Sequence, residues 1–390
     1  MPPRRLYFDN AATSWPKPES VYRAVDRFQR EVGAAAGRGA YAASLEADRI
    51  VAAARRHMAR LLGSESSRQI VFANSGTDSL NLALHGWLRP GDHVVTTAAE
   101  HNSVLRPLGE LAVRRQIGVT RVACDSAGLV DPDDIRRALR PATRLVAIVH
   151  ASNVTGAIQP AEEIGQVVRS HGAAFLIDAA QTIGHLPISV NSLNADFLAA
   201  PAHKGLLGPL GTGLLYIRAG RESELLSFRQ GGTGTRSQDD RQPDSLPDKY
   251  EAGNLNMPGL AGLAAAVEFL EQEGVAAIAA REAALADRLQ AGLQEIIGVT
   301  VYGPADSSRR VGVASINIRG YDPQEAATLL DCSFGIQVRG GLHCAPAMHE
   351  RLGTLATGGT VRFSLGAFNS ESDVDAAIAG VATLARNAID

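Results

Sequence analysis

The chain has 390 residues, of which 45% are hydrophobic, 20% charged and 5% aromatic, a composition typical of a globular protein and unlike that of disordered, collagen-like or coiled-coil chains. Its 38 basic and 41 acidic side chains give a formal net charge of −3, so no overall positive field favours nucleic acid or an anionic membrane as a partner. The sequence shows no apolar leader after Met1 and no run of eighteen apolar residues, and we expect a cytoplasmic protein.

Short apolar runs alternate with helical patterns over roughly the first 220 residues. Helical spacing joins Leu80, Leu84 and Leu88, and it recurs around 164–168. The runs of strand length are 70–72, 94–96, 119–123, 145–149, 175–177, 197–198 and 214–216. Continuous apolar strands of this kind indicate a mostly parallel sheet covered by helices on both faces, an α/β fold. An all-helical fold is disfavoured because the runs are short and bounded by Gly, Asp or Pro.

The amino-acid composition of the sequence changes after about Gly253. Alanine-rich amphipathic segments predict helices over 260–270 and 278–297. The segments that follow predict a strand at 313–318, a helix at 323–330, a strand at 361–365 and a last helix opened by Ser370 and Glu371. We therefore predict a large domain over 14–255 and a smaller α+β domain over 256–390.

A glycine-containing turn, 74–79, joins the predicted strand at 70–73 to the predicted helix at 80–88. Such a turn points unpaired backbone N–H groups outward at the positive end of a helix dipole, where a phosphate can bind. The alternative is an ordinary capped helix start. The turn lacks the Lys-Ser/Thr of a P-loop, so a nucleoside triphosphate is not its natural ligand.

A second polar cluster follows two neighbouring strands. Asp178 ends one apolar strand with Gln181 just beyond it, and His203 and Lys204 follow the next strand. Carboxyl ends of neighbouring parallel strands meet at one crevice, so the acid and the lysine can face one ligand. The alternative is a solvated lysine and an aspartate paired elsewhere. A phosphate anchor, a carboxylate for a pyridinium nitrogen and a lysine for a Schiff base together match pyridoxal 5′-phosphate (PLP).

Seven blocks of sequence carry a resemblance to a known family. They are 7–13 (YFDNAAT), 99–102 (AEHN), 150–156 (HASNVTG), 178–181 (DAAQ), 203–204 (HK), 339–345 (RGGLHCA) and 361–365 (VRFSL). In this order the chain resembles the class V aminotransferase-type PLP enzymes of the cysteine desulfurase family, closest to its short-loop, SufS-like branch (group II). The resemblance implies PLP-dependent transferase fold type I, with a large PLP-binding domain and a smaller C-terminal domain.

The resemblance implies four roles around the cofactor ring. Lys204 would bond the cofactor as a Schiff base and move the substrate's α-proton, which requires an uncharged amine in a desolvated pocket. Asp178 would keep the pyridine nitrogen protonated. Gln181 would hydrogen-bond the ring's phenolic oxygen, and His101 would stack on the ring and take part in catalysis. Without its motif, His101 would be an ordinary polar loop residue.

The resemblance also implies how the phosphate and the substrate are bound. Gly76, Thr77 and His203 would hold the phosphate. Arg362 would grip the substrate carboxylate through two hydrogen bonds, assisted by Asn153, so that the Cα–H bond is oriented for reaction.

Three further features belong to the implied site. Ala11 is in the implied substrate-binding set, and segment 1–13 is expected to pack near the active site. The glycine-rich segment 231–235 resembles one that relatives extend to the cofactor phosphate of a partner subunit. Thr235 is therefore a candidate cofactor ligand, and a homodimer is implied.

The three cysteines differ in their sequence surroundings. Cys344 follows Gly340-Gly341, which we expect to form a flexible loop, and lies beside His343; such surroundings permit thiolate formation and access. Cys332 follows an apolar pair and is expected in the core, and Cys124 is expected to be structural. The odd number and the lack of close CxxC pairs indicate a reduced compartment and no metal site.

The implied reaction is conversion of L-cysteine to L-alanine, with a persulfide formed on Cys344 and passed to an acceptor protein. A selenocysteine lyase, a cystine C–S lyase or a non-catalytic scaffold subunit of the same fold are the alternatives. Two positions depart from the family pattern. Leu342 replaces the first of two histidines, and Pro201 replaces a serine often found three residues before the lysine.

Overall fold

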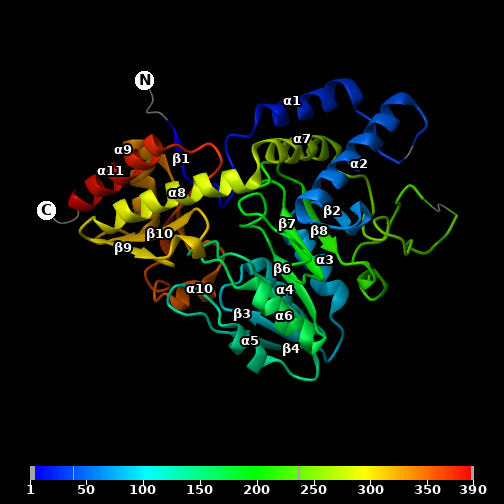
Figure 1. The fold of residues 1–390 in the computed structure, drawn as a ribbon, viewed down its shortest axis with the longest axis horizontal. Helices are drawn as coiled ribbons and strands as arrows, with labels where there is room; N and C mark the ends of the chain where they lie inside the picture. Colours follow the sequence, from blue (N-terminus) through cyan, green and yellow to red (C-terminus); the bar gives the residue numbers. More distant parts are fainter. Residues whose placement is uncertain (1–4, 38, 236–237, 388–390) are drawn as a thin grey trace.

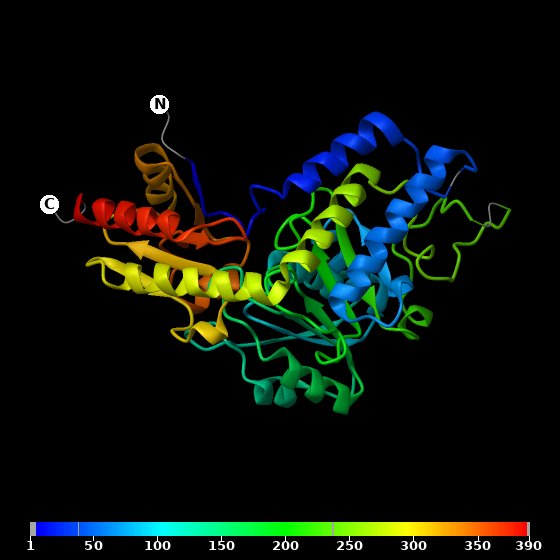
Figure 2. The ribbon, with the colours of Figure 1, turned by 45° about the horizontal axis from the view of Figure 1, so that its top comes forward.

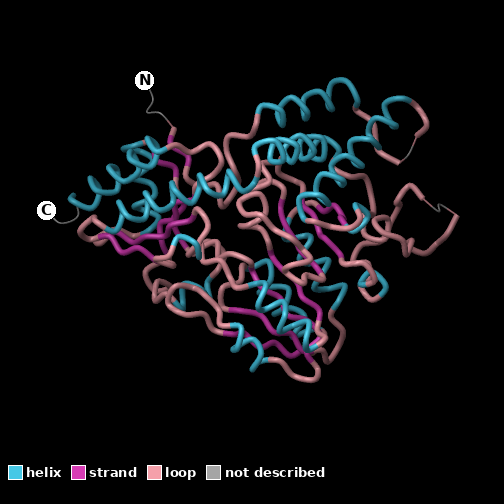
Figure 3. Tube along the Cα trace, viewed as in Figure 1, coloured by secondary structure: helices cyan, strands magenta, loops and turns pink. Residues whose placement is uncertain are grey.

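Two groups of strands and helices make up the molecule, seen as two clusters of strands in Figure 3. The computed structural model describes residues 5–37, 39–235 and 238–387. Within these residues, one cluster is a seven-stranded sheet and the other contains a four-stranded sheet.

The large sheet has the strand order β2-β8-β7-β6-β5-β3-β4. Its strands are β2 (Ile70–Ala73), β3 (His93–Thr97), β4 (Gly118–Val122), β5 (Thr143–Val149), β6 (Ala174–Asp178), β7 (Phe197–Pro201) and β8 (Gly213–Ile217). Strands β4, β3, β5, β6 and β7 run parallel, whereas β8 is antiparallel to both β7 and β2. Every residue of β6 and β7 is buried, as expected for strands covered on both faces. The predicted mostly parallel sheet is thus confirmed.

Helices cover the two faces of this sheet in two groups (Figure 1). One hydrophobic cluster includes α1 (Glu19–Arg27), α2 (Ala42–Leu62), α5 (Pro132–Ala138), α6 (Ala161–His171) and α7 (Met257–Glu273). The other includes α3 (Gly76–Trp87) and α4 (Asn102–Arg114). Short non-α helical turns occur at Phe28–Val32, Ser67–Gln69, Arg221–Ser223 and Ser307–Arg309. None of the helices in the described ranges is long and apolar enough to span a membrane.

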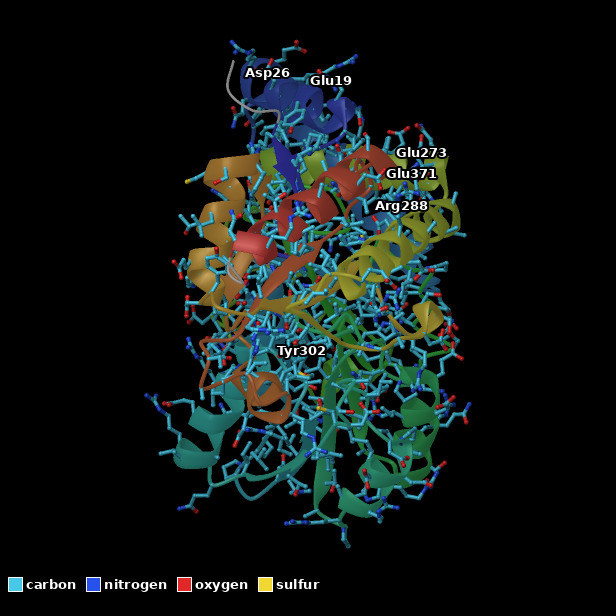
Figure 4. The ribbon with its side chains drawn as sticks, turned by 90° about the vertical axis from the view of Figure 1, so that its left-hand side faces the viewer. Glu19, Asp26, Glu273, Arg288, Tyr302 and Glu371 are labelled. Atoms are coloured by element: carbon cyan, nitrogen blue, oxygen red, sulfur yellow. The ribbon has the colours of Figure 1, made fainter. Side chains whose placement is uncertain are left out.

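The second group is built on an antiparallel sheet of order β12-β13-β10-β9. Its strands are β9 (Val299–Tyr302), β10 (Val313–Ile318), β12 (Arg339–Gly341) and β13 (Thr360–Ser364), and its helices are α8 (Val275–Gln294), α9 (Pro323–Phe334) and α11 (Glu371–Asn387). Helix α10 (Pro346–Arg351) follows β12 in the chain, but its Met348 is buried in the core of the large sheet. Arg288 of α8 lies next to Glu371 of α11, as Figure 4 shows, and its Nε is 2.6 Å from an oxygen of Asp375. Helices α8 and α11 therefore lie side by side on this unit.

The N-terminal segment packs with this C-terminal unit. Strand β1 (Leu6–Tyr7) pairs in parallel with β11 (Ile336–Gln337). Phe8 is fully buried, and its ring meets that of Phe363 edge-on with centroids 5.9 Å apart. The segment then passes toward the large sheet, where Ser14 N–H donates to the carbonyl of His203.

The hydrophobic contacts place α7 with the large sheet and not with the C-terminal unit. Leu263 and Val267 of α7 are buried in the core of the large sheet, as is Ile278 near the start of α8. Leu285 and Leu289, further along α8, are buried in the core of the C-terminal unit. The two-domain division stays a prediction, and this packing favours a boundary within α8 over one at residue 256.

Two local expectations were wrong. Gly340 and Gly341 belong to strand β12, which pairs with β13, and do not form a loop. Cys332 is exposed on α9, because it lies two residues beyond the buried Leu330 and therefore on another side of the helix.

Candidate active site

A pocket opens at the carboxyl ends of β5, β6 and β7, where the first turns of α3 and α4 meet them. Its empty volume is about 500 Å³. Eight of the residues singled out from the sequence line it: Gly76, Thr77, His101, Asn153, Asp178, Gln181, His203 and Lys204. The carboxyl edge of a parallel sheet therefore brings these residues together as expected.

Lys204 lies three residues beyond β7, on a tight turn whose backbone is well held. Its carbonyl accepts hydrogen bonds from Ser14 Oγ (2.9 Å) and from Leu207 N–H (2.8 Å). Burial lowers the pKa of Lys204 to about 8, although the charge of Asp178 works in the opposite direction. With this pKa, about a tenth of the amine is uncharged at pH 7 and can accept a proton.

Asp178 is the last residue of β6 and is 4% exposed. The backbone N–H of Ala180 donates to its Oδ1 (2.9 Å). Burial raises the pKa of Asp178, and the Ala180 hydrogen bond and the charge of Lys204 oppose that effect. A buried carboxylate in this position gains most from a cationic N–H partner in the pocket.

The first turn of α3 also lines the pocket. Ser75 caps the helix by accepting from Asp78 N–H (3.1 Å), which leaves the first-turn N–H groups at Gly76 and Thr77 facing outward. A Cβ at Gly76 would lie 2.9 Å from Cδ of Pro201, so glycine permits the helix start and the end of β7 to meet. His203 Nδ1 nearby is buried without a hydrogen-bond partner in the described residues.

His101 caps α4 with its ring. Its Nδ1 accepts from Ser103 N–H (3.0 Å), which assigns the ring proton to Nε2. Burial lowers the pKa of His101 to about 4, and the charges of Lys204 and Arg339 add to this effect. The imidazole is therefore neutral at physiological pH.

Arg362 comes from β13 of the C-terminal unit and is 1% exposed. Its Nη2 donates to Asp9 Oδ1 (2.7 Å), and its Nη1 donates to the carbonyl of Asn153 (3.1 Å). Its Nε has no hydrogen-bond partner in the described part of the chain. The guanidinium thus stands between the N-terminal segment and the end of β5, with a donor still available.

Cys344 lies in a turn between β12 and α10, where His343 and Cys344 both have left-handed backbones (φ 48° and 59°). Asn153 Nδ2 donates to the carbonyl of His343 (2.6 Å), and Asn102 N–H donates to the carbonyl of Cys344 (2.8 Å). Asn153 lines the pocket of Lys204, and Asn102 is the neighbour in sequence of His101, which also lines it. The sulfur lies 3.8 Å from Nη2 of Arg339 and lines a broad groove on the outside. An electropositive, partly exposed position is typical of reactive cysteines.

Four predicted residues do not line the pocket: Arg362 and Cys344, described above, and Ala11 and Thr235. Ala11 lies at its edge, where its carbonyl accepts from Gln181 Nε2 (3.1 Å). Thr235 lies on an exposed loop and hydrogen-bonds Thr233 (2.9 Å) and Asp248 (3.3 Å). Within this one chain, Thr235 is therefore not brought to the site.

Sequence reasoning missed three residues that hold the site. Ser103 bonds both His101 and Thr77 Oγ1 (2.7 Å), and its position two residues after a helix-capping His101 was a usable local signal. Asp9 stands in the quoted N-terminal motif, but its pairing with Arg362 spans 353 residues and has no local signature. Glu100 is fully buried, and burial raises its pKa to about 8.

Comparison with known proteins gives a consistent result. The family model "Aminotransferase class-V" matches residues 6–377. A protein of Methanothermobacter thermautotrophicus named "Probable cysteine desulfurase" is 38% identical, over 95% of this chain and 92% of its own length. The apo cysteine desulfurase of Thermococcus onnurineus superposes with a TM-score of 0.91 at 34% identity, covering 98% of this chain and 95% of that one. The cysteine desulfurase CsdA of Escherichia coli gives 0.87 at 28%, covering 99% and 94%.

These similarities extend over nearly the whole chain and over both of its units. They include the strand ends that carry Asp178 and Lys204 and the turn that carries Cys344. The chain belongs to the class V aminotransferase family, and its relatives in that family include the cysteine desulfurases.

Proposed function

We propose that this protein is a PLP-dependent cysteine desulfurase that converts L-cysteine to L-alanine and retains the sulfur as a persulfide on Cys344. The observation that carries the proposal is the attachment of the Cys344 turn to the pocket of Lys204 and Asp178. Asn153 supplies that attachment, since it lines the pocket and donates to the carbonyl of His343. A thiol placed beside a lysine–aspartate pocket suits sulfur removal better than transfer of an amino group.

The residues of the pocket fit PLP. The N–H groups at the start of α3 would hold the phosphate, together with Nδ1 of His203, which has no hydrogen-bond partner within the described ranges. Asp178 would pair with the pyridinium N–H, and the neutral ring of His101 would face the cofactor ring. Gln181 would reach the phenolic oxygen. When bound, PLP supplies an electron sink for the charge left when the substrate's α-proton departs.

Lys204 takes the role of base. With its pKa lowered to about 8, its Nζ can take the proton from the substrate's Cα and return one later. Arg362 binds the substrate carboxylate, and its Nε, which has no partner in the described residues, offers a donor that Asp9 does not use. This grip fixes the Cα–H bond relative to Lys204.

Cys344 takes the sulfur. Its thiolate attacks the sulfur of the bound substrate: an S–S bond forms, the Cβ–S bond breaks, and the electron pair of that bond stays with the carbon. The carbon takes up a proton and leaves as alanine. The groove outside Cys344 then gives an acceptor access to the persulfide.

Several narrower expectations belong to this proposal. They are the SufS-like subtype, the cytoplasmic location, the acceptor protein and a homodimer in which Thr235 reaches the partner's cofactor. The exposed position of Thr235 suits that last role. A selenocysteine lyase or cystine C–S lyase is the second candidate, and the latter would not need the thiol of Cys344.

The test is product analysis of Cys344→Ala, with Cys332→Ala as the control because Cys332 is exposed and lies outside the 339–345 motif. Alanine, sulfide and protein-bound persulfide are measured with cysteine, cystine, selenocysteine and cysteine sulfinate. We expect alanine release from cysteine to fall at least about a hundredfold in Cys344→Ala and to stay unchanged in the control. Unchanged turnover of cysteine by Cys344→Ala would contradict the persulfide mechanism.

A further inference from the structure

Helix α8 passes from one hydrophobic core to the other. Ile278 is buried with the large sheet, and Leu285 is buried in the core of the C-terminal unit. Figure 2 shows α8 in yellow, running from the region of the large sheet along the small one. Arg281 of α8 also donates to the carbonyl of Ala367, just after β13 (2.8 Å). The direction of α8 therefore sets where the C-terminal unit lies.

A buried ion pair holds α8 at its crossing point. Glu282 lies between the two sets of core residues and is 4% exposed. Its Oε2 is 2.7 Å from Nδ1 of His185, which lies on the segment between β6 and β7. Burial alone would lower the pKa of His185, but the charge and the hydrogen bond of Glu282 outweigh it and raise that pKa. Removing one partner leaves the other buried without its complement.

The ring of His185 packs against the turn that carries Lys204. A Cβ placed on Gly205 would lie 2.5 Å from Cδ2 and 2.7 Å from Nε2 of this ring, and 2.3 Å from the carbonyl oxygen of Ile183. A Cβ on Gly184 would lie 2.1 Å from the carbonyl oxygen of Gly205. The two backbones approach this closely because both positions are glycine. A shift of His185 would therefore displace Gly205, the residue next to Lys204.

We propose that His185 and Glu282 are a positioning pair, which fixes the turn of Lys204 relative to α8 and to the C-terminal unit that carries Cys344 and Arg362. The inference rests on the proposed roles of those three residues. Lys204 and Arg362 come from different units, so their separation depends on contacts that cross between the units. A displacement of about 1 Å in such an arrangement can cost up to about a hundredfold in rate.

A second histidine–glutamate pair, which is more exposed, provides a control. His57 Nδ1 is 2.8 Å from Glu271 Oε2, so the pair has nearly the same length. It joins α2 to α7, both of which cover the large sheet, and Arg60 of α2 is its other hydrogen-bond partner. If His185 and Glu282 only stabilised the fold, removing either pair could lower Tm but would leave kcat unchanged.

The experiment uses the full-length holoenzyme and a double-mutant cycle of His185→Ala and Glu282→Ala, with His57→Ala as control. We expect each single variant to lower kcat for alanine release about tenfold with KM for cysteine changed less than about threefold. The double variant should be no slower than the singles, because they disrupt one contact. Glu282→Gln, which can keep a hydrogen bond, should fall between Glu282→Ala and the wild type and serves if an alanine variant does not fold.

Two readouts do not depend on turnover. In the holoenzyme without substrate, the pH midpoint of the bound cofactor's absorption band should shift in His185→Ala and not in His57→Ala. In the apoprotein, peptides covering 203–207 and 275–294 should exchange amide hydrogens faster in His185→Ala. The proposal is overturned if Tm falls while kcat, the spectral midpoint and exchange stay at wild-type values. If the wild type releases no alanine, the proposed function fails, and these two readouts still decide the role of the pair.

Discussion

The pocket of Lys204 and the turn of Cys344 are built in opposite ways. Asp178 and Lys204 stand at the ends of β6 and β7, strands whose residues are all buried. Cys344 stands in a turn with a left-handed backbone, partly exposed, on the wall of an open groove. The pocket groups have shifted pKa values because water is kept away from them, whereas the thiol remains within reach of the surface.

This difference fits the two tasks proposed for these regions. Moving a proton at carbon needs an amine that can be uncharged, and burial provides it for Lys204 by lowering its pKa to about 8. Handing sulfur to another molecule needs a thiol that the other molecule can reach. Hydrogen bonds from Asn153 and Asn102 join the two regions without burying the sulfur.

The largest effect is expected from Lys204→Ala. Without the amine, the pocket loses both its covalent attachment point and its base, so alanine release should fall at least about a thousandfold. Borohydride reduction of the wild-type holoenzyme followed by peptide mapping should label Lys204. Lys249, which is also buried and donates to the carbonyl of Glu222, is the internal control and should stay unlabelled. Label on Lys249, or cofactor retained covalently in Lys204→Ala, would refute the assignment.

Arg362→Ala should have the next largest effect. Its loss removes a charge-assisted contact to the substrate carboxylate, and kcat/KM for cysteine should fall about a hundredfold, mainly through KM.

Arg339→Ala tests the other region, because Arg339 lies beside the sulfur of Cys344. Its loss should lower persulfide formation more than it raises KM. A similar increase in KM for Arg362→Ala and Arg339→Ala would argue against separate roles for Arg362 in substrate binding and for Arg339 beside the sulfur.

The parts of the site that could be read from the sequence are those set by local pattern. A short apolar run ending in Asp178, and a second run followed by Lys204, predict strand ends at one sheet edge. Cys332 was misplaced because its apolar neighbours suggested burial, whereas helical periodicity puts it on another side from Leu330. Gly340 was misplaced because glycine is rare in strands. A Cβ there would lie 2.4 Å from the carbonyl oxygen of Pro323, so close packing explains the residue.

The parts that could not be read are contacts between distant segments. Asp9 and Arg362 are 353 residues apart, and His185 and Glu282 are 97 apart. Each of these residues, taken alone, looks like an ordinary surface charge. Only the packing of α8 and of the N-terminal segment brings the partners together.

A smaller effect is expected from Asn153→Ala, which removes the hydrogen bond to the carbonyl of His343. The turn of Cys344 should then move more freely, and alkylation of Cys344 by iodoacetamide in the apoprotein should speed up about threefold to tenfold. Alkylation of the exposed Cys332, followed in the same sample by mass spectrometry, should not change. Equal acceleration at both cysteines would indicate general loosening of the fold and would remove Asn153 as a specific link between the two regions.

The smallest effect on turnover is expected at Glu100, which is fully buried behind the pocket. Burial raises its pKa to about 8, against hydrogen bonds to its Oε1 from Thr97 Oγ1 (2.6 Å) and Val149 N–H (3.0 Å). A folded-state pKa above the unfolded value stabilises the fold fully below about pH 4.5, and this contribution is lost as pH rises toward 8. Glu100→Gln mimics the protonated acid and should not lose it. Its free energy of unfolding, measured with urea on the apoprotein, should gain on the wild type by up to about 1.4 kcal/mol per pH unit between pH 5 and 8. Glu268→Gln, at an exposed position on α7, should run parallel to the wild type; a parallel curve for Glu100→Gln as well would mean that Glu100 is already ionised in the folded protein.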